Sequence, residues 1–209
     1  MFDGNTLLTF IGAGLVLNIT PGPDVLYIVG RSLSQGRAAG VVSALGISTG
    51  CLVHVAAAAL GLSTLMLTVP LAYDAVRYAG AAYLVWLGIR ALMSRSHALT
   101  VRSMTPVGQW VIFRQGMVTN ALNPKVALFF LAFLPQFTDP ARGSLALQFV
   151  VLGLVFIANG LAVCLGYALA ASWLGGWLTR RYDIHTWLNR AMGALFIGLG
   201  LRLVLGGRR

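Results

Sequence analysis

Six apolar stretches, separated by short polar connections, run along the chain. Each is long enough to cross the hydrocarbon layer of a membrane as an α-helix, which takes about 20 residues. The pattern therefore predicts an all-α, polytopic membrane protein with six transmembrane helices. The predicted spans cover residues 7–30, 38–69, 71–93, 115–136, 145–178 and 187–205.

The spans fall into two triplets of similar layout. The middle span of each triplet is longer than one perpendicular crossing, so tilt, an internal break or an end outside the bilayer must absorb the excess. Residues 1–93 form the first predicted three-helix repeat and residues 115–209 the second, joined by a connection at 94–114 within one membrane domain (1–209). An odd number of spans per repeat reverses the second copy, which predicts an inverted-topology duplication.

Proline interrupts the first span of each triplet. The first interruption reads Asn18-Ile-Thr-Pro-Gly-Pro-Asp24 and the second Asn120-Ala-Leu-Asn-Pro-Lys125. A helix broken within hydrocarbon leaves backbone N–H and C=O groups that need partners from protein, water or ligand. Matching breaks in the two halves of a duplicated membrane protein are the best sequence pointer to a transport site. The residues that form these breaks are Pro21, Gly22, Pro23 and Pro124.

The two breaks carry charges of opposite sign. When Pro23 is aligned with Pro124, Asp24 falls opposite Lys125. A charged side chain in the middle of a transmembrane helix costs about 2.5–3.5 kcal/mol on insertion scales, so each needs a reason to be there. Asp24 can cap the helix that resumes after its break, and the two residues can form a purely structural ion pair. The functional alternative is a hydrated cavity in which Lys125 holds the carboxylate of a zwitterionic cargo and Asp24 its ammonium group.

Four further polar side chains at the breaks complete the candidate substrate-binding set. Their amide and hydroxyl groups can serve the freed backbone groups, which is a structural role, or can contact the cargo. They are Asn18, Thr20, Asn120 and Asn123.

Composition supports a membrane location. The chain is 58% hydrophobic and 10% charged, whereas soluble domains are about 25% charged. The net charge of +10 would suit nucleic acid, but most arginines lie in short connections, where they orient helices, so no nucleic-acid partner is expected. Nine arginines fall on the side of the first, third and fifth connections and five on the side of the termini. We therefore expect those connections in the cytoplasm and both termini outside.

The remaining candidates for chemistry have simpler explanations. Cys51 and Cys164 lie in apolar stretches and are expected to pack as small hydrophobic side chains. His54 is expected to be a buried imidazole bonded to backbone rather than a metal ligand. Gly46 and Gly50 have the spacing of a helix-packing face. No nucleophile–base pair, phosphate loop or metal-spaced cluster stands out, so we expect no enzyme, no metal and no cofactor.

Four short stretches at and after the breaks are distinctive: Thr20-Pro-Gly-Pro-Asp24, Gly30-Arg-Ser-Leu-Ser-Gln-Gly36, Asn123-Pro-Lys-Val-Ala-Leu-Phe-Phe130 and Leu134-Pro-Gln-Phe137. With these stretches the sequence resembles the LysE/RhtB family of bacterial amino-acid exporters, of the homoserine/threonine efflux type. The resemblance implies a six-helix protein of the bacterial inner (plasma) membrane. It also implies export of small amino acids such as homoserine, threonine, leucine or lysine, driven by the proton gradient.

We therefore expect alternating-access export by proton antiport. Asp24 is the candidate proton carrier, because the other four acids lie in loops or tails and His54 is the only alternative within the spans. A single acid within the membrane also favours a neutral cargo, since a cationic side chain would need another. The expected partners are a small amino acid, protons and membrane lipids, and a homo-oligomer is left open.

Two other functional classes stay open. One is a transmembrane thiol shuttle that uses Cys51 and Cys164, which lie in the second span of each half. A redox pair is expected beside the proline breaks, and the sequence places neither cysteine there. The other is a membrane scaffold without transport, which would tolerate neutralisation of Asp24 and Lys125 together.

Overall fold

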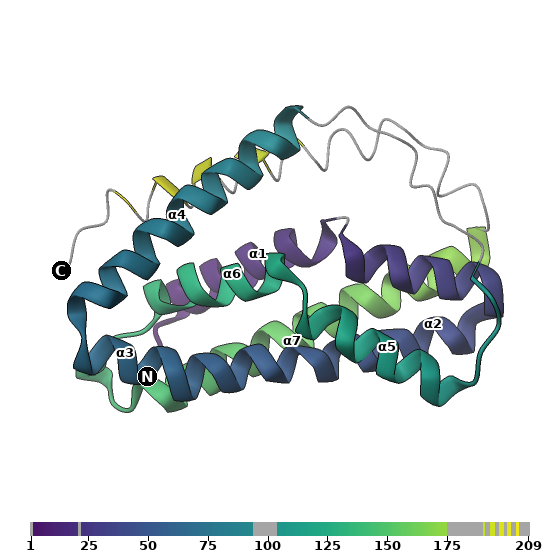
Figure 1. Cartoon of the computed structure of the whole chain (residues 1–209), viewed down its shortest axis with the longest axis horizontal. Coiled ribbons are helices and arrows are strands. Elements are labelled where there is room, and N and C mark those ends of the chain that lie inside the picture. Colours follow the sequence, from purple (N-terminus) through teal and green to yellow (C-terminus); the bar gives the residue numbers. More distant parts are fainter. Residues whose placement is uncertain are drawn as a thin grey trace.

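The computed structural model describes residues 2–20, 22–93 and 104–174, together with positions 190, 193, 194, 197, 198, 200, 201 and 204. Every regular element within these residues is helical (Figure 1). A π-helical turn, Ala58–Leu62, joins α2 to α3, and 3-10 turns at Leu134–Phe137 and Pro140–Arg142 lead from α6 to α7. The helices are α1 Gly4–Ile19, α2 Pro23–Ala57, α3 Ser63–Thr68, α4 Pro70–Met93, α5 Gln109–Ala121, α6 Pro124–Ala132 and α7 Leu145–Leu174.

Several of these helices have the length and composition of membrane spans. Within the described residues, Pro23–Thr68 and Leu145–Trp173 are long and apolar enough to cross a membrane. Gln109–Ala121 and Pro124–Phe137 meet at a 45° bend, and together they would form a third span. α4 matches the predicted helix at 71–93, whereas more than half of the predicted sixth span lies outside the described residues. The six-span arrangement therefore stays a prediction.

Both predicted helix breaks are confirmed. α1 ends at Ile19 and α2 begins at Pro23, with extended backbone at Gly22 between them; Pro21 lies outside the described residues. The second break separates α5 from α6, which starts at Pro124. Proline suits the first position of a helix, because the N–H it lacks would have no partner there.

The predicted end of the first span, at Gly30, is wrong. The sequence suggested a connection at residues 31–37, but α2 stays helical as far as a sharp turn at Gly36, where φ is 80°. Glycine adopts this left-handed backbone without steric cost. We call residues 23–35 the first limb of α2 and residues 37–57 its second limb. Arg31, expected in an exposed connection, is instead buried within the first limb.

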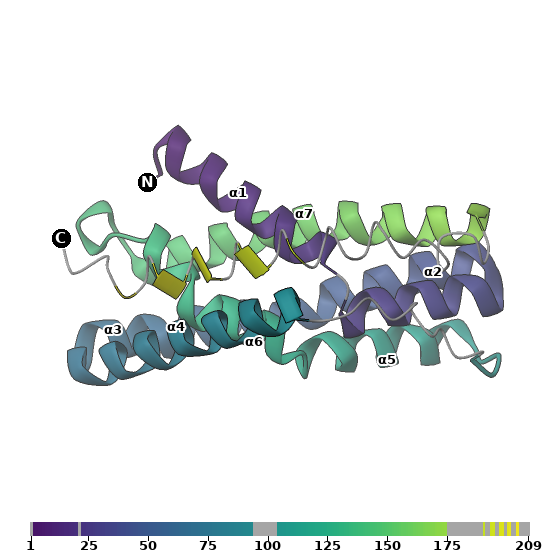
Figure 2. The same cartoon turned by 90° about the horizontal axis from the view of Figure 1, so that it is seen from above.

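The two broken segments run past each other in opposite directions. α1 and the first limb of α2 follow one another along the long axis of the molecule, and α5 and α6 follow one another the opposite way (Figures 1 and 2). Their breaks therefore meet near the middle of the molecule. This arrangement is compatible with the predicted inverted repeat.

The second limb of α2 forms a close interface with α5 and also packs along α7. A Cβ atom added at Gly46 would lie 2.3 Å from the Phe113 carbonyl oxygen, and one at Gly50 2.2 Å from that of Met117. Both positions therefore need glycine, and the predicted helix-packing face is confirmed.

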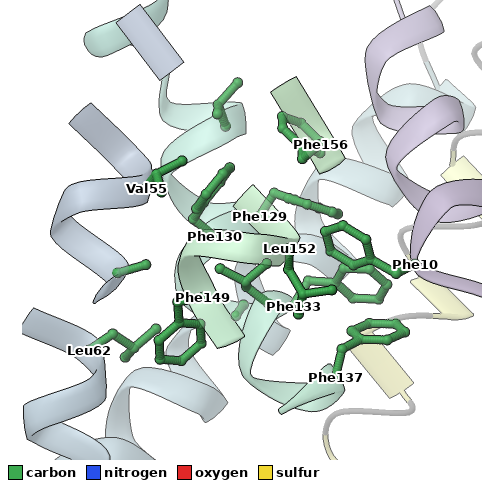
Figure 3. Close-up of a cluster of buried hydrophobic side chains, with 14 of the residues drawn as sticks. Phe10, Val55, Leu62, Phe129, Phe130, Phe133, Phe137, Phe149, Leu152 and Phe156 are labelled. Atoms are coloured by element: carbon green, nitrogen blue, oxygen red, sulfur yellow. The ribbon is translucent and has the colours of Figure 1, made fainter. Parts of the chain in front are cut away.

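On one side of the breaks lies a core of phenylalanine side chains from α1, α6, α7 and the turn after α6 (Figure 3). Ring centroids of neighbouring members lie close together, for example 4.8 Å apart for Phe129 and Phe133 and 4.9 Å for Phe129 and Phe156. The ring of Phe10, on α1, meets Phe137 edge-on at 5.3 Å. This packing closes the molecule between the breaks and the N-terminal end of α1.

Candidate functional site

The charged residue of each break is hydrogen-bonded to groups of the other break. Asp24, in the first break, accepts hydrogen bonds from amides of the second, and Lys125 donates to carbonyl groups of the first. The breaks therefore form one structural unit, although about a hundred residues separate them in sequence.

Asp24 is the second residue of α2 and is buried, with 8% of its surface exposed. Its Oδ2 accepts hydrogen bonds from Asn120 Nδ2 and Asn123 Nδ2, both at 2.9 Å. Its Oδ1 has no partner within the described residues. The carboxylate thus keeps one oxygen free for another ligand.

Lys125 is the second residue of α6. Its Nζ donates to the carbonyl oxygens of Leu17 at 3.1 Å and Thr20 at 3.2 Å. These groups end α1, where the last carbonyls have no partner within the helix and carry the negative end of its dipole. A Cβ atom added at Gly22 would lie 3.2 Å from the same Nζ, so a side chain there would crowd the ammonium group.

Asp24 and Lys125 do not pair directly. The ion pairs among the described residues are those of Arg142 with Asp3 and Asp139, and no N···O distance of 4.0 Å or less joins Asp24 to Lys125. A purely structural ion pair therefore does not account for the two charges in this conformation.

Both charged residues line a small cavity at the breaks. Its volume is about 30 Å³, which accommodates about one water molecule and is too small for an amino acid. Asn18 and Asn120 contribute polar side chains to its wall. The remaining wall residues, mostly apolar, are Val25, Ile47, Ser48, Cys51, Val126, Phe156, Ile157, Gly160 and Cys164.

Three polar atoms of this wall lack a hydrogen-bond partner within the described part of the chain. They are Asn18 Nδ2, Asp24 Oδ1 and Asn120 Oδ1. A buried polar atom without a partner costs about 1–3 kcal/mol, and native structures contain few of them. Three of them belong to residues that line one cavity, where a polar ligand atom or a water molecule would give them partners.

Thr20 and Asn123 have clear structural roles. The Thr20 hydroxyl donates to the Val16 carbonyl at 2.7 Å within its own chain segment, and Thr20 does not line the cavity. Asn123 caps α6 by accepting from the Lys125 backbone N–H at 3.0 Å, while its amide nitrogen donates to Asp24. Of the four polar candidates, Asn18 and Asn120 are those that face the cavity.

His54 behaves as expected from the sequence. Its Nε2 lies 2.9 Å from the Asn120 carbonyl oxygen, and its ring lies 5.9 Å from that of Phe130. The imidazole thus serves a backbone group at the second break. The described residues contain no cluster of three or more His, Cys, Asp or Glu side chains suited to a metal ion.

The positions of the two cysteines correct an expectation. The sequence separates Cys51 and Cys164 from the breaks, yet both buried, unpaired thiols line the cavity beside Asp24. The cause is packing: the second limb of α2 and the middle of α7 both lie against the breaks. Both thiols therefore lie at the candidate site and not away from it.

Two buried polar contacts were not predicted from the sequence. The Tyr167 hydroxyl, on α7, donates to the Ile19 carbonyl at 2.6 Å and so serves the end of α1 together with Lys125. Arg31 contacts α5 through Gln115 at 2.7 Å. No local signal marks Tyr167, because its partner is a backbone group distant in sequence. The sequence around Arg31 is a distinctive motif, but it does not indicate that Arg31 is buried.

Comparison with known proteins gives a consistent result. A family model described as LysE type translocator matches residues 15–207. A homoserine/homoserine lactone efflux protein of Salmonella typhimurium is 31% identical, over 90% of this chain and 90% of the relative. A leucine efflux protein of the same species is 27% identical, with coverages of 93% and 92%.

A Vibrio cholerae protein described only as an uncharacterized membrane protein is 30% identical, over 96% of this chain and 97% of its own. No solved structure matches the chain. The family model extends over both breaks and nearly the whole sequence. The protein therefore belongs to the family of LysE type translocators.

Proposed function

We propose that this protein exports small, neutral amino acids, or close derivatives, from the bacterial cytoplasm across the inner membrane. The observation that carries the proposal is the set of free polar atoms around one cavity. Asp24 Oδ1 and Asn120 Oδ1 are acceptors, which an ammonium group needs. Asn18 Nδ2 and the nearby Lys125 ammonium group are donors, which a carboxylate needs. The inventory matches the two ends of a zwitterion.

The rest of the wall supports a neutral cargo. Apart from Asp24 and Lys125, the cavity is lined by apolar, thiol and uncharged polar groups. A cationic or anionic cargo side chain would be buried there without a counter-charge, which is costly. The efflux proteins among the relatives are named for homoserine and leucine, both of which are neutral at the side chain.

Asp24 is the group that couples export to protons in this proposal. Protonation from outside removes the charge that holds the cargo ammonium group, so the cargo leaves outward, and deprotonation toward the cytoplasm restores the site. A proton that moves across 100 mV supplies about 2.3 kcal/mol, enough for a roughly fortyfold gradient of a neutral cargo. The antiparallel course of the two broken segments supports alternating access between inverted repeats.

Transport by purified protein in liposomes tests this role. Asp24→Asn keeps the size of the side chain and removes its titration, so uptake driven by a pH gradient should vanish, while exchange of labelled for unlabelled amino acid can persist. Asp74→Asn is the matched control. Asp74, expected in a connection, lies instead on α4, and it does not line the cavity. Unchanged pH-driven transport in Asp24→Asn would remove Asp24 from the coupling role.

The thiol shuttle remains a second candidate, because both cysteines line the cavity. It predicts loss of function when Cys51 and Cys164 are both replaced by alanine, whereas an amino-acid exporter retains transport. A deletion strain challenged with toxic levels of single amino acids separates an exporter from both the thiol shuttle and a scaffold, since only an exporter gives selective sensitivity.

A further inference from the structure

The first limb of α2 is joined to its two neighbours by different kinds of contact. Toward α7 it presents apolar side chains, with Val25 and Val29 packed against Ala171. Toward α5 and the segment before it, an apolar cluster that includes Ile28 and Ile112 is accompanied by a polar seam made by Tyr27, Arg31 and Gln35. The hydrogen bonds of such a seam can be exchanged for bonds to water when the elements separate.

Arg31 is the centre of this seam and is 5% exposed. Its Nη2 donates to Gln115 Oε1 at 2.7 Å, and its Nη1 to the Thr105 carbonyl at 3.0 Å and to Gln35 Oε1 at 2.8 Å. Gln35 in turn bonds both backbone groups of Val107. One guanidinium therefore fastens the limb to α5 and to the segment that leads into it.

Tyr27 lies between Arg31 and the cavity. It is one helical turn beyond Asp24, and its hydroxyl donates to the Ile112 carbonyl at 2.8 Å and lies 3.3 Å from Gln115 Oε1. On the outer side, Tyr27 and Gln115 line an open groove of about 560 Å³, a volume within the range of ligand pockets. Tyr27 thus lines the open groove, while Asp24, one helical turn before it on the same limb, lines the small cavity.

The limb is also bounded by two points at which the backbone departs from helix. Thr20 and Gly22, both with extended backbone, lie before it, and Gly36, at φ 80°, lies after it. By contrast, the second limb is locked to α5 by the glycine contacts at Gly46 and Gly50. A motion of the first limb relative to α5 therefore leaves the rigid interface intact.

We infer that the Tyr27–Arg31–Gln115 network is the gate at one end of the transport path, and that the first limb of α2 is the part that moves. The phenylalanine core closes the opposite end (Figure 3). On the expected orientation, the polar gate faces the cytoplasm and the aromatic closure faces outward. The inference rests on the proposed function in one respect, the assignment of the polar gate to the cytoplasmic side. The motif at residues 30–36 does not line the cavity, and the gate gives its residues Arg31 and Gln35 a role.

The native cysteines provide the test, because the chain has only two and both line the cavity. A membrane-impermeant maleimide is applied to inside-out and right-side-out vesicles, and the labelling rates of Cys51 and Cys164 are measured. Arg31→Gln removes charged hydrogen bonds and should raise labelling at least about tenfold, from the cytoplasmic face only. Tyr27→Phe removes one hydroxyl and should raise it less, from the same face.

Two further variants serve as comparisons. Arg37→Gln makes the same change on an exposed arginine of α2 and should leave labelling as in the wild type. Phe133→Ala, in the aromatic closure, should raise labelling from the outer face. Unchanged labelling in Arg31→Gln and Tyr27→Phe, or an equal rise from both faces, would overturn the gate. Because no amino acid is added, the labelling rates test the gate independently of whether the protein transports amino acids.

Discussion

Asp24 and Lys125 occupy the same helical position, each directly after the proline that restarts a helix. A carboxylate is stabilised there by the positive end of the helix dipole, and an ammonium group is destabilised, each by about 0.3–1 kcal/mol. Lys125 is therefore unfavourable for its own helix. This cost is offset by its hydrogen bonds to the carbonyl groups that end α1, and its side chain also lines the cavity.

Replacement of Lys125 by methionine keeps much of the apolar stem and removes the cation. The proposed carboxylate contact is a hydrogen bond to a charged group, worth about 1.5–3 kcal/mol. We expect the KM for transport to rise at least about tenfold, while Lys125→Arg, which keeps the charge, retains more of the affinity. A KM in Lys125→Met equal to that of the wild type would contradict carboxylate binding by this residue.

Asp3 provides a surface prediction about pH. Its carboxylate accepts from the Thr6 backbone N–H at 2.7 Å and from the Thr6 hydroxyl, which lowers the pKa of Asp3, with Arg142 adding to the effect. A lowered folded-state pKa means that the stabilisation is fully present above the usual pKa of aspartate and is lost as pH falls through the lowered value. The difference in Tm between wild type and Asp3→Ala should therefore persist at pH 5 and shrink only in stronger acid. A difference that disappears near neutral pH would contradict this assignment.

Residues at the breaks were predictable because breaks are local features. Asn18, Asp24, Asn120 and Lys125 stand where proline frees backbone groups, and the structure gathers them around one cavity. The approach of Tyr167 to the end of α1, and of the two cysteines to the cavity, was not predictable. Which face of α7 meets the breaks depends on packing between distant segments, and a uniformly apolar helix carries no period that reveals it.

At the scale of the element, Asn123 both caps a helix and contacts the candidate site. Its Oδ1 caps α6 while its Nδ2 binds Asp24. Asn123→Ser retains a capping oxygen but not the amide donor, so it should unfold near the wild-type temperature yet alter transport. Asn123→Ala loses both functions and should cost about 0.5–2 kcal/mol from the cap alone. Thermal unfolding in detergent, measured beside transport, separates the two effects, and equal destabilisation by both variants would deny the capping role.

The first limb of α2 shows where element prediction fails. Polar residues after Gly30 resembled a connection, yet Arg31 and Gln35 remain helical, because Thr105, Gln115 and Val107 satisfy their side chains. Tertiary partners thus turned a loop-like sequence into a buried helix. The true turn is set by a single glycine.

At the scale of the whole molecule, the cavity is far smaller than any amino acid, so the proposed binding of cargo there requires a change of shape. A ligand that binds only the folded protein stabilises it, by about 2.7 kcal/mol at a hundred times its Kd. Detergent-solubilised protein should therefore show a raised Tm with a neutral amino acid such as leucine, and a weaker rise with leucinamide, which lacks the carboxylate.

The same comparison identifies which end of the cargo each charge holds. In Lys125→Met, leucine and leucinamide should shift the Tm about equally, because the group that distinguishes the carboxylate is gone. In Asp24→Asn, both shifts should fall together, because both compounds carry the ammonium group. A wild-type protein that responds equally to leucine and leucinamide, while still transporting leucine, would place the carboxylate away from Lys125 and require a different orientation of the cargo in the cavity.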